Sequence, residues 1–142
     1  ERLGQRVVIV GGGLVGCELA LQLSQTGRQV TVVDRKAEVC RDASFLYREG
    51  LLMELEKAGV AIRSGTGCLS VEAGGVCVRL PEGGTELLPA DTAVSAVGAE
   101  PLDSEAEQFR ELADDFWKIG DCFQVRKIFN ARREGYNAGA HI

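Results

Sequence analysis

The most constraining feature of the sequence is a glycine-rich stretch that follows a run of β-branched residues. Residues 7–10 read Val-Val-Ile-Val, and Gly11, Gly13 and Gly16 fill the fixed positions of the pattern G-x-G-x-x-G. The first glycine of this pattern lets the chain turn out of a strand, the second lets the backbone approach a pyrophosphate, and the third lets a helix pack closely on the strand. We therefore predict a strand, a tight turn and a helix whose free N–H groups and positive dipole end face an anion.

The residues around the glycines fit a βαβ unit. Residues 7–10 suit a central parallel strand that is buried on both faces. We expect a helix over residues 14–26, ended by Gly27, and a second strand over residues 30–33. That strand leads to Asp34, about 20 residues beyond the glycines, where a carboxylate can bind the ribose hydroxyls of an adenosine. The alternative is a glycine-rich turn in some other α/β protein.

The following residues predict an α/β fold, a Rossmann-like parallel sheet with flanking helices. After a charged loop we expect a helix over residues 45–58 and a strand over residues 60–63. A parallel strand over residues 92–97 then leads to Gly98. Between them the pattern predicts an antiparallel β-meander crossover, with short strands over residues 68–72, 76–80 and 86–89.

The C-terminal part of the sequence has weaker patterns. Residues 101–115 are acidic and poor in apolar side chains, which predicts a loop with one helical turn. Residues 116–119 predict one more short strand, and residues 125–142 predict a final helix that two glycines weaken.

Composition argues against several classes of function. The formal net charge of −5 disfavours non-specific nucleic-acid binding. We find no apolar run long enough for a bilayer and no signal peptide, so we expect a cytoplasmic protein without a membrane partner. The five cysteines form no C-x-x-C pair and His141 is the lone histidine, which predicts free thiols and no metal site.

Three stretches together resemble one family. Residues 11–18, with Glu18 after the glycines, are similar to the NAD-binding insert of flavoproteins that carry two dinucleotide-binding domains. Residues 95–101 (Ser-Ala-Val-Gly-Ala-Glu-Pro) resemble the turn where this insert rejoins the FAD domain. Residues 119–122 (Ile-Gly-Asp-Cys), followed by Arg-Lys-Ile and Glu-Gly-Tyr, look like the second FAD motif. This form is similar to the C-terminal region of Old Yellow Enzyme-like NADH:flavin oxidoreductases, the 2-enoate and 2,4-dienoyl-CoA reductases.

The resemblance implies a part of a larger NAD(P)H:flavin oxidoreductase. Residues 1–98 would form the NAD(P)H-binding domain, and residues 99–142 the end of an incomplete FAD-binding domain. NADH would deliver a hydride to FAD, while FMN and an iron–sulfur cluster would belong to absent domains. We therefore expect only a partial FAD site, little activity of this chain alone, and either the missing domains or a second copy against the exposed FAD-domain face.

The expected contacts to the nicotinamide nucleotide begin at the glycine turn. Backbone there and in the first helical turn would hold the pyrophosphate, at Gly11, Gly13, Leu14, Val15 and Gly16. Asp34 favours NADH over NADPH because its carboxylate repels a 2′-phosphate. Arg35 beside it weakens that preference, since a cation can bind a phosphate.

The remaining candidate residues come from the resemblance. It implies that Glu18 and Gly98 lie near the nicotinamide, and that Gly120 and Asp121 contact the flavin, with Asp121 on the ribityl chain. Their alternative roles are a helix-start carboxylate for Glu18, a strand-ending turn for Gly98 and a helix N-cap for Asp121. No catalytic residue is predicted, because the cofactors carry the chemistry.

Two other classes of function compete with this hypothesis. One is a non-catalytic module that binds a nucleotide or senses redox state with the same fold. The other is a stand-alone dehydrogenase, which is disfavoured because no second domain in the sequence supplies a substrate site or a proton donor.

Overall fold

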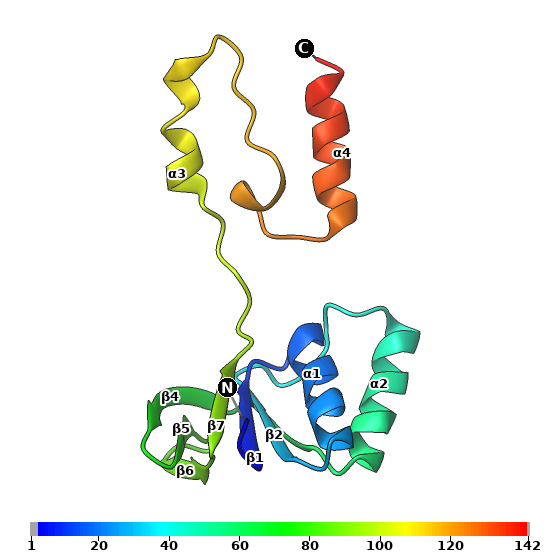
Figure 1. Cartoon of the computed structure of the whole chain (residues 1–142), viewed down its shortest axis with the longest axis vertical. Helices are drawn as coiled ribbons and strands as arrows, with labels where there is room; N and C mark the ends of the chain where they lie inside the picture. Colours follow the sequence, from blue (N-terminus) through cyan, green and yellow to red (C-terminus); the bar gives the residue numbers. More distant parts are fainter. Residues whose placement is uncertain (1–2, 142) are drawn as a thin grey trace. The chain divides into compact units, whose positions relative to one another are not determined.

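The computed structural model describes residues 3–141, which form two compact units that meet in the sequence at Gly98 and Ala99 (Figure 1). The first unit contains a four-stranded parallel sheet, two helices and a three-stranded antiparallel sheet. The second unit contains helices and their connections, with no strand among the described residues after Gly98. The predicted fold class, a Rossmann-like parallel sheet with an antiparallel meander, is confirmed.

The parallel sheet has the strand order β3-β2-β1-β7, so β1 pairs with the two strands that flank it in space. Val7 of β1 lies opposite Val30 of β2 on one side and Thr92 of β7 on the other. The strands are β1 (Arg6–Val10), β2 (Gln29–Asp34), β3 (Ala61–Ser64) and β7 (Thr92–Ser95). Because all four are parallel, the carboxyl ends of β1, β2 and β7 lie at one edge of the sheet, and the glycine turn follows β1 there.

The helices α1 (Leu14–Gln25) and α2 (Phe45–Lys57) follow β1 and β2, and each begins and ends close to its expected bounds. They lie on the same side of the parallel sheet (Figure 1). Alternate residues of β1 face opposite ways, as a strand requires. Val7 and Ile9 belong to the core beneath the helices, together with Leu55 of α2, and all three are almost fully buried.

The second face of β1 packs against the antiparallel sheet. Val8 belongs to a separate core cluster with Val76 and Val78 of β5, and all three are almost fully buried. This sheet has the order β4-β5-β6, with β4 (Gly67–Glu72), β5 (Gly75–Arg79) and β6 (Thr85–Pro89), so the predicted meander is confirmed. Burial on both faces explains why residues 7–10 are apolar without alternation.

The second unit departs from the sequence-based expectation in two places. The strand expected over residues 116–119 is wrong: Ile119 has an extended backbone, but the described part of this unit offers no strand with which it could pair. The final helix α4 (Ile128–Gly139) begins three residues later than expected, after Lys127 in an extended conformation. The acidic segment forms α3 (Asp103–Glu107) and a 3₁₀ turn, η1 (Arg110–Leu112), which is more helix than expected.

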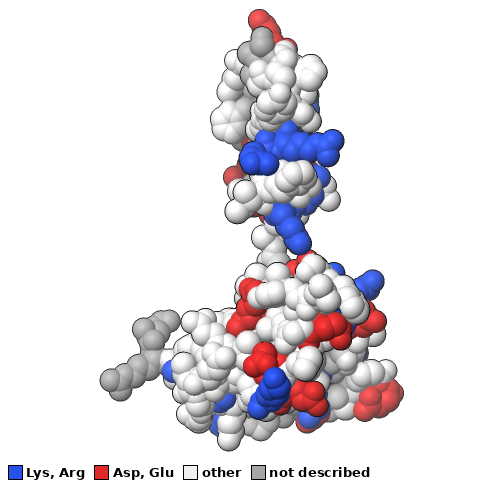
Figure 2. Space-filling view, turned by 90° about the vertical axis from the view of Figure 1, so that its right-hand side faces the viewer, with Lys and Arg blue, Asp and Glu red and all other residues white. Residues whose placement is uncertain are grey.

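The second unit has almost no core of its own. Ala138 is the one buried residue among its described residues, and large apolar side chains are open to solvent, with Ile128 88% and Tyr136 78% exposed. Figure 2 shows Lys and Arg side chains gathered on one face of this unit; the exposed cations of α4 and the residues before it are Arg126, Lys127, Arg132 and Arg133. A unit with so little buried apolar area gains little hydrophobic stabilisation by itself.

Candidate functional site

Backbone contacts at the glycine turn are too close for any side chain. Gly11 follows β1 with a φ of 112°, and a Cβ there would lie 2.3 Å from the backbone oxygen of Ala96, just after β7. A Cβ on Gly16 of α1 would lie 2.0 Å from the backbone oxygen of Gly11. Real Cβ atoms do not approach so closely, so glycine at these two positions lets α1 begin directly against the ends of β1 and β7.

Gly13 is the N-cap of α1 and faces open space. The atoms within 4 Å of a Cβ placed there are the two carboxylate oxygens of Asp42, both at 3.9 Å. Asp42 also accepts a hydrogen bond from the backbone N–H of Leu14, with a distance of 3.0 Å from N to Oδ1. A carboxylate therefore lies on the N-terminus of α1, where the sequence predicts the pyrophosphate.

Asp34 links the end of β2 to the glycine turn. Its Oδ2 accepts a hydrogen bond from the backbone N–H of Gly12 at 2.7 Å, and its Oδ1 accepts one from the N–H of Lys36 at 2.8 Å. The carboxylate is thus held by two backbone amides beside the first helical turn. Arg35 follows with an exposed side chain, and Val15 of α1 is 70% exposed.

The loop after β2 closes over the glycine turn through two buried residues. The backbone N–H of Cys40 donates to the oxygen of Gly12 at 2.7 Å, and a Cβ on Gly12 would lie 2.5 Å from Cγ1 of Val39. Cys17 of α1 lies in the same cluster, and its thiol donates to the oxygen of Gly12 at 3.6 Å. A hydrogen bond between the side chains of Cys17 and Cys40, together with burial, raises the pKa of the Cys17 thiol, so Cys17 stays protonated.

Sequence reasoning missed Gly12, Val39, Cys40 and Asp42 as parts of this site. The signal for two of them was present, because Val39 and Cys40 are adjacent apolar residues in an otherwise charged loop. No sequence pattern indicated Asp42, because its contact with the N-terminus of α1 depends on how the loop after β2 folds back.

Glu18 contacts a second helix. The hydroxyl of Tyr47, in α2, donates a hydrogen bond to Oε1 of Glu18 at 2.6 Å. This bond to the carboxylate raises the pKa of Tyr47 above its ordinary value. The Glu18 carboxylate is therefore held by a hydrogen bond from α2, in addition to its position near the start of α1.

Gly98 and the two predicted flavin contacts belong to different units. Gly98 follows β7 at the end of the first unit. Gly120 and Asp121 form a 3₁₀ turn, η2 (Gly120–Cys122), in the second unit, where the N–H of Gly120 donates to Oε2 of Glu134 at 2.8 Å. The alternative role of Asp121 as the N-cap of the final helix is wrong, because Lys127 is the N-cap of α4. Oδ1 of Asp121 instead accepts a hydrogen bond from the N–H of Arg126 at 3.4 Å.

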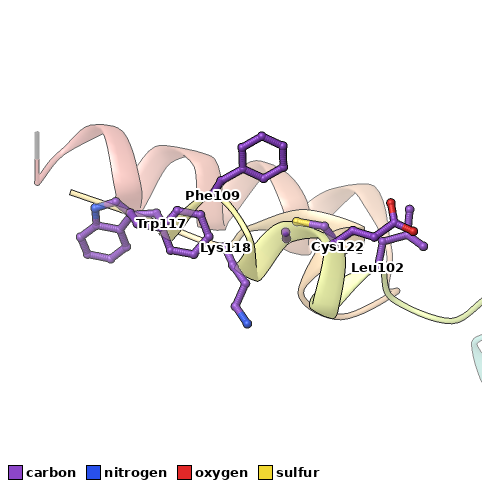
Figure 3. A pocket seen from close by; sticks show the side chains of 8 residues that line it. Leu102, Phe109, Trp117, Lys118 and Cys122 are labelled. Atoms are coloured by element: carbon purple, nitrogen blue, oxygen red, sulfur yellow. The ribbon is translucent and has the colours of Figure 1, made fainter. Parts of the chain in front are cut away.

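A cavity of about 330 Å³ lies wholly in the second unit (Figure 3). Its lining is mostly apolar and includes Leu102, Phe109, Trp117 and Cys122, together with the charged Lys118. None of the predicted contact residues lines it. Among residues 3–141 we find no group of metal-ligating side chains, and no helix with the length and apolar character needed to cross a membrane.

Comparison with known proteins identifies related chains. A model of the pyridine nucleotide-disulphide oxidoreductase family matches residues 1–135. The chain is 30% identical to an NADH oxidase of Thermoanaerobacter brockii over 139 residues, and 36% identical to a bilirubin reductase of Mediterraneibacter gnavus over 134 residues. These alignments cover 97% and 94% of the chain and 21% of each relative, so the chain spans about a fifth of their length.

Comparison with solved structures also finds a match to one part of a larger reductase. A 2-naphthoyl-CoA reductase in complex with 2-naphthoyl-CoA superimposes with a TM-score of 0.85 and 26% identity. That match covers the whole chain and 22% of the reductase.

Proposed function

The chain belongs to the pyridine nucleotide-disulphide oxidoreductase family, in agreement with the resemblance of its motifs to flavin-dependent oxidoreductases, and we propose that its first unit binds NADH at the glycine turn. The observation that carries this proposal is the steric form of the turn. Gly11 and Gly16 bring three backbone segments together, and Gly13 places no side chain over the N-terminus of α1, where the Asp42 carboxylate lies 3.9 Å from its Cβ position. A pyrophosphate placed there would receive N–H groups and the positive end of the helix dipole.

Asp34 supports NADH as the preferred nucleotide. Its carboxylate is already oriented by Gly12 and Lys36, so it can accept hydrogen bonds from ribose hydroxyls without reorganising. The 2′-phosphate of NADPH would meet this negative charge at short range. Arg35 has an exposed side chain beside it and offsets part of that repulsion.

In the larger protein, we propose, this unit presents NADH to a flavin. The bound nucleotide supplies a hydride, and this chain's residues bind and orient it. Glu18, held by Tyr47, and Gly98, after β7, would border the nicotinamide end. The motifs favour a cytoplasmic enzyme that reduces a substrate of the enoate or dienoyl-CoA class. FMN and an iron–sulfur cluster would lie in its other domains.

The second unit, we propose, completes an FAD-binding domain together with further protein. Its exposed apolar side chains and single buried described residue support this, because such a unit requires a partner surface for stability. Gly120 and Asp121 would contribute one part of the flavin site. A second copy of the chain can cover the same surface, which predicts a homodimer when the other domains are missing.

Calorimetric titration of the purified chain with NADH, NADPH and FAD tests the proposal. We expect saturable NADH binding, weaker NADPH binding and little FAD binding, and loss of NADH binding in Gly13→Val. Circular dichroism of each variant verifies that it is folded. A folded chain that binds neither nicotinamide nucleotide would contradict the proposed function.

A further inference from the structure

Asp42 occupies the place that the proposed function assigns to a phosphate. It lies in the exposed segment between Cys40 and the start of α2, yet its carboxylate reaches the first turn of α1. Oδ1 accepts from the N–H of Leu14 at 3.0 Å, and both oxygens lie 3.9 Å from the Cβ position of Gly13. Gly13 has no capping side chain and the first turn of α1 carries no acidic residue, so Asp42 supplies the negative charge there.

This contact has two physical consequences. A carboxylate at a helix N-terminus is stabilised by the helix dipole and by the N–H groups of the first turn. The same groups attract a pyrophosphate, and two anions cannot share one N–H donor at short distance without strong repulsion. A pyrophosphate bound at Gly13 therefore displaces Asp42 or binds against its charge.

We propose that Asp42 is an affinity-setting residue that competes with the dinucleotide pyrophosphate for the N-terminus of α1. The inference rests on the proposed function, because it takes the pyrophosphate as the competing ligand. For a pyrophosphate to displace the Asp42 carboxylate, Asp42 must move away from Leu14. Cys40, whose backbone N–H donates a hydrogen bond to the oxygen of Gly12, would keep the glycine turn in place. Arg41 and Asp42 have exposed side chains, whereas Cys40 is fully buried, so the packed part of this loop ends at Cys40.

The variant Asp42→Asn tests this proposal, because an amide oxygen still accepts from Leu14 but carries no charge. The matched control is Glu38→Gln, which removes one charge from the same loop, where Glu38 pairs with Arg41 at 3.8 Å. We expect Asp42→Asn to bind NADH about fivefold more tightly, the effect of removing one like charge about 4 Å away in a water-like medium. Glu38→Gln should bind as the wild type does.

Three further measurements separate competition from a general change. Adenosine, which has no phosphate, should bind all three proteins equally. Thermal unfolding without nucleotide should show a lower midpoint for Asp42→Asn than for Glu38→Gln, because the dipole of α1 loses its anion. Raising the salt concentration should reduce the difference in NADH affinity, because salt screens exposed charges.

The outcomes distinguish this inference from the proposed function. Equal NADH affinity in Asp42→Asn and Glu38→Gln, or tighter adenosine binding in Asp42→Asn, would overturn the inference and leave the function intact. NADH binding by Asp42→Asn alone would support the inference, because the charge of Asp42 would then block the site, and would contradict NADH binding by the wild-type chain. Binding by none of the three folded proteins would overturn both.

Discussion

The backbone N–H of Gly12 donates a hydrogen bond to Oδ2 of Asp34 at 2.7 Å, which joins the turn after β1 to the end of β2. These two residues belong to the parts of the proposed site that hold the pyrophosphate and the adenosine ribose. Because the carboxylate also accepts from the N–H of Lys36, Asp34 has a structural role in addition to its proposed binding role.

Asp34→Asn should therefore alter nucleotide preference more than folding. The amide oxygen still accepts one backbone hydrogen bond, but the charge that repels a 2′-phosphate is gone. We expect NADH affinity to fall by tenfold or more, since hydrogen bonds to a charged group contribute roughly 1.5–3 kcal/mol each. NADPH affinity should fall less or rise, which parallel titrations would show. An unchanged ratio of the two affinities would mean that Asp34 does not contact the ribose.

Gly13→Ala should separate binding from folding. A Cβ at this N-cap meets only the Asp42 oxygens at 3.9 Å, so the fold should tolerate it while the approach of a phosphate is hindered. We expect NADH affinity to fall roughly tenfold or more, the loss of one charged hydrogen bond, with little change in the unfolding midpoint. Full affinity in Gly13→Ala would place the phosphate elsewhere.

Gly16→Ala should act on folding instead. Its Cβ would lie 2.0 Å from the oxygen of Gly11, so α1 must shift away from β1, at a cost of about 1–3 kcal/mol or more for overpacking. Gly50→Ala is the matched control, because Gly50 lies inside α2 with open space around it and should gain about 0.5–1 kcal/mol. Urea unfolding of the two variants measures both effects. Equal stability of the two would contradict the close packing of α1 on the glycine turn.

The contact between Tyr47 and Glu18 predicts a shifted phenol titration. The chain has two tyrosines, so the measurement uses a Tyr136→Phe background in which Tyr47 alone contributes. Ultraviolet titration should place the pKa of Tyr47 above its ordinary value, because the hydrogen bond that its hydroxyl donates to the Glu18 carboxylate favours the protonated phenol. Glu18→Gln should lower that pKa. If Glu18→Gln leaves the titration unchanged, the hydrogen bond is absent in solution.

Arg6 and Asp91 predict part of the response to acid. The Arg6 guanidinium lowers the pKa of Asp91 from 3.8 to about 2, and the pair joins β1 to the residue before β7. A lowered pKa in the folded state adds stability above pH 3.8, which is lost as the pH falls through about 2. Asp91→Asn should be less stable than wild type at neutral pH and show a smaller loss between these values. Thermal melts as a function of pH test this, and parallel curves for the two proteins would contradict it.

The strands and helices of the first unit could be predicted because local sequence and tertiary structure agree there. Residues 7–10 are apolar on both faces of β1, and the glycines have steric roles that any such turn requires. The prediction failed at residues 116–119, where an apolar run has no neighbouring strand among the described residues of its unit. A strand depends on a partner, and a single sequence does not show whether that partner is present.

The site was predictable where a motif fixes residue spacing and not where the chain folds back on itself. Asp34 was found from its distance to the glycines, and its carboxylate accepts a hydrogen bond from the N–H of Gly12. Asp42 contacts Leu14 across a sequence separation of 28 residues, and Tyr47 contacts Glu18 across 29. The loop and the helix that supply these two side chains carry no motif. Contacts of this kind depend on the path of the loop after β2.

The most direct test of the central claim is a nuclear magnetic resonance titration of the labelled chain with NADH. We expect saturable shifts that are largest at the backbone amides of Gly12, Leu14, Val15 and Lys36, with little change at Gly50. Saturable shifts confined to the second unit, or the absence of shifts in a folded protein, would contradict nucleotide binding at the glycine turn.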